Sequence, residues 1–137
     1  MDIYLDINSE VPIYQQIRNQ VVLGLAEGRL CNNESLPSTR QLAADFGINF
    51  HTVNKAYDIL RQEGIIKLNR KTGAVIFIEP PPQDFVSQWR ENAKVWLAEA
   101  IVKGVSKADI IRECEDIISQ FEDWTNPSSG HEGSELS

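Results

Sequence analysis

Residues 36–76 read LPSTRQLAADFGINFHTVNKAYDILRQEGIIKLNRKTGAVI, and this stretch decides the fold. Ser38 followed by Gln41 is a capping-box pattern, in which each side chain satisfies a free N–H at the start of a helix. The pattern predicts a helix over Thr39–Phe46, whose apolar residues face a core and which Gly47 interrupts.

A second helix and a hairpin follow at once. Asn49 can cap a helix over Phe50–Glu63, and two helices joined by a short glycine-containing turn form a helix-turn-helix. Ile65–Leu68 and Ala74–Ile78 are β-rich runs on either side of a basic, glycine-bearing tip, which predicts a hairpin. A hairpin in this position is a wing, so the stretch predicts a winged helix-turn-helix.

The segment before this stretch predicts one more helix, over Val11–Gly28. Apolar residues recur in it every four positions and form one stripe: Ile13, Ile17, Val21 and Leu25. We expect Pro12 in its first turn, where the missing N–H costs nothing. The prediction for residues 1–78 is therefore one winged helix-turn-helix domain of the α+β class, mainly α.

The segment after the hairpin predicts a linker and a separate helical part. Consecutive prolines make residues 79–83 an extended spacer. Residues 84–124 predict two amphipathic helices, separated at Gly104 and packed as an antiparallel pair. Residues 125–137, rich in Ser, Gly and Glu, predict a disordered tail.

The net charge of −7 is unevenly distributed along the chain. Residues 1–78 carry eight basic and eight acidic side chains, and within residues 38–78 six basic side chains outnumber three acidic ones. From Glu79 onward, twelve acidic side chains face five basic ones. Because binding to phosphates requires a locally basic surface, the overall acidity does not exclude a nucleic-acid partner.

The positive segment predicts a surface that contacts double-stranded DNA. In a winged helix, the second helix of the pair enters the major groove with its N-terminal residues against the base edges. The candidate contacts on that helix are Asn49, Phe50, His51, Thr52, Asn54 and Lys55. Arg40 in the preceding helix can contact the DNA backbone or a guanine. Arg70 and Lys71 at the hairpin tip can reach the minor groove or neighbouring phosphates.

Four motifs resemble the GntR family of bacterial regulators, in family order and spacing. They are PIYQQI at 12–17, LPSTRQLA at 36–43, TVNKAY at 52–57 and LRQEGI at 60–65. The resemblance implies a DNA-contacting role for Arg40 and for the recognition-helix positions, and it adds Thr72 and Gly73 at the wing tip. Many members carry arginine where this chain has Phe50, so a thymine-methyl contact can replace a guanine contact. Glycine is also common in the family where this chain has Asn33-Glu34.

The short C-terminal part resembles the YtrA-type subfamily, in which it serves dimerisation. Two amphipathic helices cannot cover their own apolar faces, whereas a second copy of the chain can. The candidate dimer contacts are Phe85, Trp89, Trp96, Ile110, Ile117 and Phe121. The alternative is that the two helices pack back on the winged domain of their own chain.

The predicted function is a sequence-specific transcriptional regulator, expected to be a repressor, that binds an inverted-repeat operator as a homodimer. The alternative is a winged helix used as a protein-interaction or architectural module without sequence preference. A small-molecule effector between the tryptophan-bearing helices is a further possibility.

Other functional classes lack sequence support. The chain has no GxSxG, P-loop or HExxH motif, which predicts that it is not an enzyme. Cys31 and Cys114 form no CxxC pair, so we expect neither a metal nor a cofactor, and both cysteines are expected to be buried. With no membrane-length apolar run and no signal-peptide pattern at residues 1–10, we expect a cytoplasmic protein.

Overall fold

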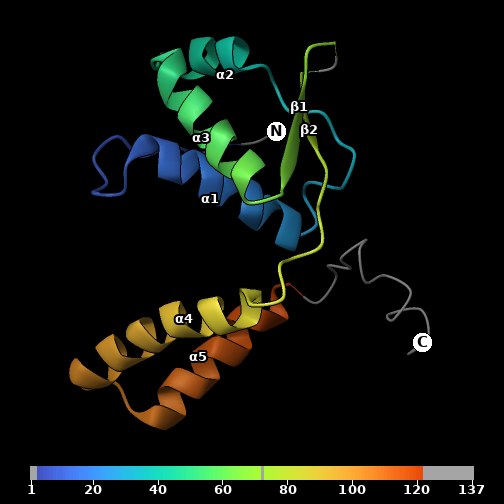
Figure 1. Cartoon of the computed structure of the whole chain (residues 1–137). Helices are drawn as coiled ribbons and strands as arrows, with labels where there is room; N and C mark the ends of the chain where they lie inside the picture. Colours follow the sequence, from blue (N-terminus) through green and yellow to red (C-terminus); the bar gives the residue numbers. More distant parts are fainter. Residues whose placement is uncertain (1–2, 72, 122–137) are drawn as a thin grey trace. The chain divides into compact units, whose positions relative to one another are not determined.

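The computed structural model describes residues 3–71 and 73–121 of the chain (Figure 1). Its elements are the helices α1 (Ile13–Ala26), α2 (Thr39–Phe46) and α3 (Phe50–Gln62), the strands β1 (Ile66–Asn69) and β2 (Gly73–Ile76), and the helices α4 (Phe85–Val102) and α5 (Lys107–Ser119). One compact unit ends at Pro80 and a second begins at Pro81, and we describe each by itself. The predicted tail, Thr72 and residues 122–124 lie outside the described residues.

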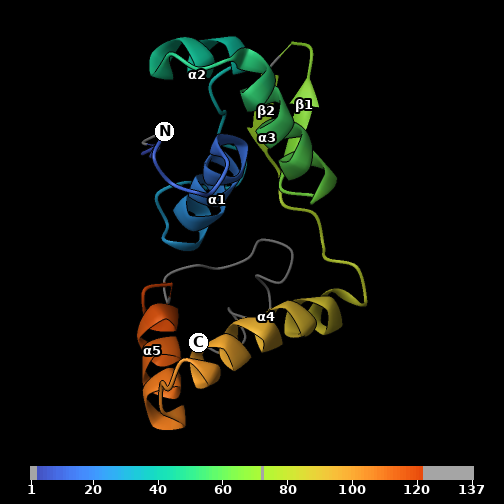
Figure 2. The ribbon, with the colours of Figure 1, turned by 90° about the vertical axis from the view of Figure 1, so that its left-hand side faces the viewer.

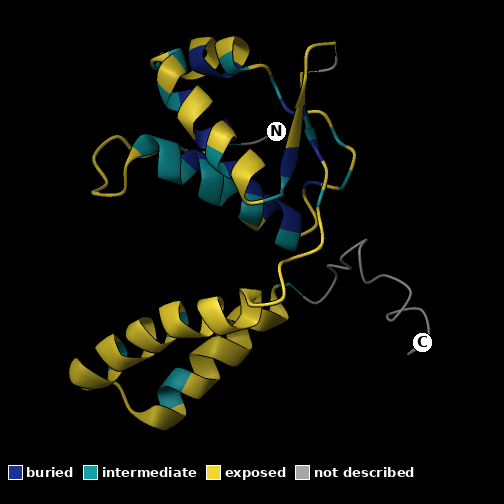
Figure 3. Cartoon of the chain, in the orientation of Figure 1, coloured by how far each residue is buried: buried dark blue, intermediate teal, exposed yellow. Residues whose placement is uncertain are grey.

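The first unit is a three-helix core closed by a two-stranded hairpin, the winged helix-turn-helix that the sequence predicts. Helix α3 packs against both α1 and α2, and β1 joins the same core (Figure 1). Figure 3 shows the buried residues gathered where these elements face one another. The largest fully buried side chains are Tyr57, Ile17, Leu42, Leu60, Ile66, Ile76, Val21 and Val53.

Helix α1 is held by the apolar stripe that the sequence contains. Ile17, Val21 and Leu25 are buried. The helix starts later than predicted, because Pro12 has the extended angles φ −56° and ψ 147° and is the residue before the first turn. A proline in that position still costs no hydrogen bond.

The turn between α2 and α3 depends on a glycine. Gly47 has φ +64°, the left-handed region that an L side chain adopts only at a cost, and nothing lies within 4 Å of the place where a Cβ would be. The next N–H, of Ile48, bonds to the carbonyl of Ala43 at 3.0 Å and closes the helix end. The prediction that Phe46 faces the core is wrong: its side chain is 37% exposed. It is the last residue of a two-turn helix whose core-facing positions are Leu42 and Ala43.

The wing is an antiparallel pair in the register Ile66↔Ile76 to Asn69↔Gly73. Ile76 and Ala74 are buried, whereas Leu68 is half exposed because β1 runs out beyond the core. The loop before α2 lies along the outer edge of β2, where Asn33 N–H donates to the Ile76 carbonyl at 2.7 Å. Asn33 has φ +73°, the left-handed region that asparagine adopts more readily than most L residues.

The second unit consists of α4 and α5, which meet at Gly104 (φ +94°). Ser106, followed three residues later by Asp109, has the sequence of a helix cap, and it caps α5: its side chain accepts from the Asp109 N–H at 3.1 Å. From the turn the two helices diverge (Figure 2), and neither contains a buried residue. Both are accordingly almost entirely in the exposed colour in Figure 3.

Candidate nucleic-acid interface

The leading end of α3 is exposed while the rest of the helix is anchored. Asn49 lies just before the helix, and its Oδ1 accepts from the His51 N–H at 2.9 Å. The side chains of His51 and Asn54 are exposed, Thr52 is half-buried, and Phe50 packs partly against the core. Because the opposite face of α3 is buried through Val53, Ala56, Tyr57 and Leu60, the exposed end is presented on a rigid element.

The start of α2 is fixed beside this end by two hydrogen bonds. Ser38 Oγ accepts from the Gln41 N–H at 3.0 Å. The Tyr57 hydroxyl, from the buried face of α3, donates to the Pro37 carbonyl at 2.6 Å. Burial raises the pKa of Tyr57 well above its ordinary value, so the hydroxyl remains a donor at neutral pH. Together these bonds hold the segment that carries Arg40.

The other half of the predicted capping box does not form. The Gln41 side chain does not return to the N–H of Ser38 and instead donates to Asp45 Oδ1 at 2.7 Å, one turn further along α2. A glutamine and an aspartate four residues apart on a helix are neighbours, so this local partner competes with the backbone.

The hairpin tip carries two exposed cations. Arg70 and Lys71 follow β1, and the Lys71 N–H donates to the side chain of Asn69 at 2.7 Å. Gly73 has φ +75° and begins the return strand. A groove of about 360 Å³ separates the tip from α3, lined by Ser38, Thr39, Asn54, Tyr57, Leu68, Asn69, Arg70, Gly73 and Ala74.

The ion pairs divide the basic side chains of the first unit into two sets. Arg18 bonds Glu63 in a bidentate pair with both N–O distances 2.9 Å, and Arg29 and Arg61 also pair with carboxylates. Among the described residues of the first unit, five basic side chains form no ion pair: Arg40, Lys55, Lys67, Arg70 and Lys71. All five belong to α2, α3 or the hairpin, so the positive charge is unneutralised where the sequence predicts contact with DNA.

Aromatic rings, rather than carboxylates, hold three of these cations. The Lys55 amine lies 4.0 Å from the ring centre of Tyr14 in α1, and the Lys67 amine lies 3.9 Å from that of Phe77. The Arg40 guanidinium carbon lies 4.8 Å from the ring centre of Phe50. A ring face attracts a cation without cancelling its charge, so these side chains are partly ordered and still able to meet an anion.

Sequence reasoning did not predict that Tyr57 and Tyr14 help to hold the residues of this surface in place. Tyr57 appears in the sequence only as one apolar position of α3, although a buried tyrosine hydroxyl requires a hydrogen-bond partner. That requirement was the available signal. Nothing local in the sequence indicates that Tyr14 meets Lys55, because the two residues are 41 positions apart.

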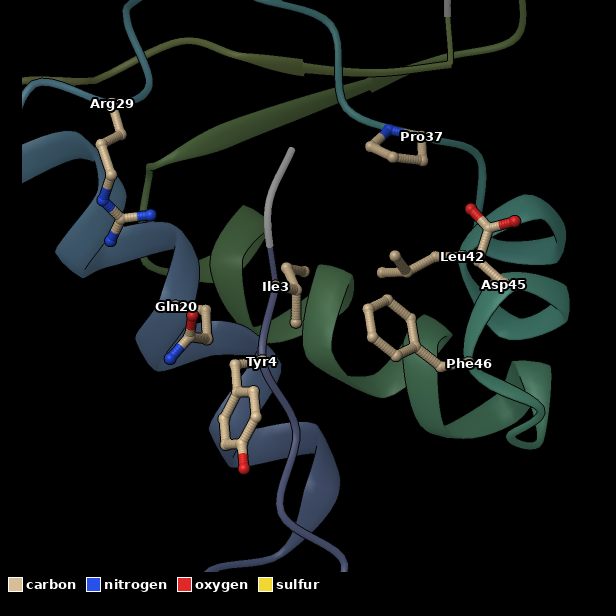
Figure 4. Close-up of a pocket in the computed structure, with 8 residues that line it drawn as sticks. All are labelled: Ile3, Tyr4, Gln20, Arg29, Pro37, Leu42, Asp45 and Phe46. Atoms are coloured by element: carbon tan, nitrogen blue, oxygen red, sulfur yellow. The ribbon is translucent and has the colours of Figure 1, made fainter.

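A second hollow of about 600 Å³ lies elsewhere on the first unit (Figure 4). It is lined by Ile3, Tyr4, Gln20, Arg29, Pro37, Leu42, Asp45 and Phe46. Figure 4 shows Ile3, Leu42 and Phe46 directed toward one another across it. None of the predicted DNA contacts lines it, and it does not lie between α4 and α5, where the sequence suggested an effector; that suggestion stays a prediction.

Both cysteines differ from expectation. Cys31 and Cys114 are exposed, not buried. The Cys31 thiol donates to Glu34 Oε1 at 3.5 Å, and this hydrogen bond, with smaller contributions from desolvation and the carboxylate charge, raises the pKa of the thiol. Within the described residues, no three His, Cys, Asp or Glu side chains are grouped so that they could hold a metal ion.

The predicted dimer contacts in α4 and α5 lie on the open faces of the second unit. Phe85, Trp89, Trp96 and Ile117 are between 49% and 69% exposed, and Ile110 and Phe121 are half-buried. In the part of the chain that is described, no helix is both long and apolar enough for a bilayer.

Comparison with known proteins identifies the family. Residues 13–76 match the model of the bacterial regulatory proteins, gntR family. The HTH-type transcriptional repressor YtrA of Bacillus subtilis is 37% identical over 97 residues, which are 71% of this chain and 65% of that protein.

Two solved structures extend the comparison to the fold. YtrA from Sulfolobus acidocaldarius, a GntR-family transcription factor, is 36% identical with a TM-score of 0.59, over 73% of this chain and 97% of that one. A transcriptional antiterminator from Listeria monocytogenes is 25% identical with a TM-score of 0.78, over 86% of this chain and 93% of that one. The chain therefore belongs to the GntR family of DNA-binding transcriptional regulators, which are not enzymes, and is YtrA-like in its short two-helix C-terminal part.

Proposed function

We propose that this regulator is a homodimer that binds an inverted-repeat operator and represses transcription from it. The observation that carries the proposal is the segregation of charge described above. The five unpaired cations lie on α2, α3 and the hairpin, and the leading end of α3 exposes two polar side chains, His51 and Asn54. Repression is favoured by the name of the Bacillus subtilis relative, a transcriptional repressor.

The proposed contacts divide into residues that contact base edges and residues that contact the DNA backbone. Asn54 has the amide geometry to bond the N6 and N7 of adenine, and His51 and Thr52 can donate or accept at base edges. Asn49, at the entry to α3, and Lys55 lie next to the phosphates of the same groove. Arg70 and Lys71, with Thr72 and Gly73, would follow the adjacent minor groove or its phosphates.

The second proposed partner is another copy of the chain. Within their own unit, α4 and α5 bury none of their side chains, and in water apolar faces are stabilised by burial against a matching surface. A two-fold axis would bury the same faces of both copies and place two recognition helices on symmetric half-sites. The operator would then be a palindrome.

Selection from a random pool of DNA duplexes with the full-length protein tests the operator. We expect enrichment of one palindromic sequence and an affinity that falls steeply with salt, since each phosphate contact releases counterions. Enrichment of no sequence would contradict sequence-specific binding and would favour an architectural module. Replacing Arg40, His51 and Asn54 together by alanine should lower the ratio of specific to nonspecific affinity. An unchanged ratio would also contradict sequence-specific binding.

A charge placed on the open face of α4 tests the dimer. Trp96→Glu should yield a monomer in sedimentation, with weaker binding to the palindrome but unchanged binding to a single half-site. Lys94→Glu is the matched control, because it introduces the same side chain at an exposed position of the same helix. Two results would contradict the proposed dimer interface: a Trp96→Glu protein that is still dimeric, or a wild-type protein that binds the palindrome as a monomer. Either result would favour packing of α4 and α5 on their own chain.

Repression is tested by transcription in vitro from a promoter that contains the selected sequence. We expect transcript to fall as the protein occupies the site, because a dimer on the promoter excludes the polymerase. A rise in transcript would reverse the sign of regulation without affecting the operator.

A further inference from the structure

Three side chains from two helices form one stack at the leading end of α3. The Arg40 guanidinium carbon lies 4.8 Å from the centre of the Phe50 ring. The same ring lies 4.1 Å from the His51 imidazole, centre to centre, with 32° between the planes. Neighbouring positions on a helix normally point apart, so the contact between Phe50 and His51 is a feature of this helix start rather than of helices in general.

The central ring of the stack is anchored and its neighbours are free. Phe50 is half-buried and packs against the core of the winged unit, whereas Arg40 and His51 are exposed. A ring fixed on one side by the core has little freedom to move. It therefore offers a stationary platform on which a flexible side chain can be held.

Arg40 is the side chain whose conformational freedom such a platform would reduce most. It forms no ion pair within the described residues, so no carboxylate fixes the direction of its guanidinium. An unpaired, exposed arginine loses conformational entropy when a ligand immobilises it. Stacking on an aromatic face removes part of that loss beforehand, because the planar guanidinium is already oriented.

We propose that Phe50 is a positioning residue that acts through Arg40, and that the sequence preference contributed by Arg40 depends on the face of this ring. The inference rests on the proposed sequence-specific binding. It assigns Phe50 a role different from the thymine-methyl contact that its place in the recognition helix suggests. On that assignment, Phe50 orders Arg40 and reads no base itself.

A double-mutant cycle tests the coupling, with the full-length protein and the duplex obtained by selection. Phe50→Leu, which keeps an apolar side chain but removes the ring face, should weaken binding to the selected duplex about five-fold. It should leave binding to a scrambled duplex of equal length unchanged. In an Arg40→Ala background, Phe50→Leu should have no further effect, whereas additive losses in the double variant would overturn the proposal.

Two companion variants separate positioning from support of the fold. Phe50→Tyr keeps the ring and should retain wild-type affinity and the wild-type base preference. Phe46→Leu makes the same chemical change at an exposed ring of α2 that contacts no cation in the described chain, and should have no effect on either. If Phe50→Leu weakened selected and scrambled duplexes equally, or its loss persisted without Arg40, the role would be structural and the proposal wrong.

Removal of the thymine methyl groups distinguishes the alternative role. Replacing each thymine of the selected duplex by deoxyuridine should leave wild-type affinity within about two-fold. A larger loss that Phe50→Leu abolishes would show a direct methyl contact and overturn the proposal. If the wild type selects no sequence at all, both this inference and the proposed function fail. If it selects one and the cycle is additive, this inference alone fails.

Discussion

The hydroxyl of Tyr57 provides a measurable link between the core and the surface that we propose to contact DNA. It donates to the Pro37 carbonyl at 2.6 Å, and the ring that carries it is 1% exposed. Tyr57→Phe removes this bond and leaves the carbonyl without its partner, while the ring continues to fill its place. A net hydrogen bond is worth about 1 kcal/mol, and an unsatisfied buried acceptor costs about 1–3 kcal/mol. Because Pro37 is only half-buried and water can partly replace the hydroxyl, we expect a loss of about 1–2 kcal/mol.

Thermal unfolding at fixed protein concentration measures this loss. For a domain of this size, the expected decrease in melting temperature is roughly 4–8 °C for each kcal/mol. Tyr4→Phe is the matched control, since the Tyr4 side chain is 79% exposed and the same oxygen is removed. Equal melting temperatures for the two variants would refute the assignment of a stabilising role to this bond.

Burial, which raises the pKa of Tyr57, gives the same hydroxyl a second signature. As pH rises above about 10, the unfolded chain releases the tyrosine proton while the folded chain retains it. The wild type should therefore lose stability relative to Tyr57→Phe at alkaline pH, and the difference between the two proteins should shrink. A difference that stayed constant up to pH 11 would contradict burial of a neutral hydroxyl.

Three further predictions concern stability and reactivity. The bidentate pair of Arg18 and Glu63 is partly exposed, so its charges should be screened by salt. A double-mutant cycle with alanine, measured by urea unfolding, should give a coupling free energy of about 0.5–1 kcal/mol that disappears in 1 M salt. A coupling that persists in 1 M salt would contradict a screened pair. Gly47→Ala should lower the free energy of unfolding by about 1–2 kcal/mol from backbone strain alone, and Gly47→Asn should lower it less, because asparagine tolerates the left-handed region better. Equal midpoints of urea unfolding for the two variants would contradict this prediction. Glu34→Ala removes the oxygen that accepts from the Cys31 thiol and should lower the raised pKa of that thiol. Cys31 should then react faster with a disulfide reagent at about pH 8, in a variant whose other cysteine is serine. An unchanged rate would exclude Glu34 as the cause.

The fold could be predicted from local sequence signals because the signals agree. The Ser38, Asn49 and Ser106 caps form as the sequence indicates, and the hairpin forms within two residues of its predicted ends. One error lies where a local pattern has two outcomes. Gln41 could bond backwards to the helix start or forwards to Asp45, and the pattern alone does not choose.

The candidate site was predictable in its membership more than in its arrangement. Position in a winged helix identifies which residues of α3 and the hairpin face outward, and the charge distribution supports the same surface. The contacts between elements were not predictable. That Arg40 lies over Phe50, or Lys55 over Tyr14, depends on the packing of three helices, and no periodicity within one helix contains that information.

The lack of any buried residue in α4 and α5 has a consequence for how the regulator responds to its own abundance. Short helices without tertiary packing are only marginally stable in water, so ordering of these two helices would coincide with association of two copies. If that association is also required to span both half-sites, operator occupancy rises with the square of the chain concentration below the dimer dissociation constant. Such a dependence creates a threshold in expression level, below which the promoter stays free, without any inducer.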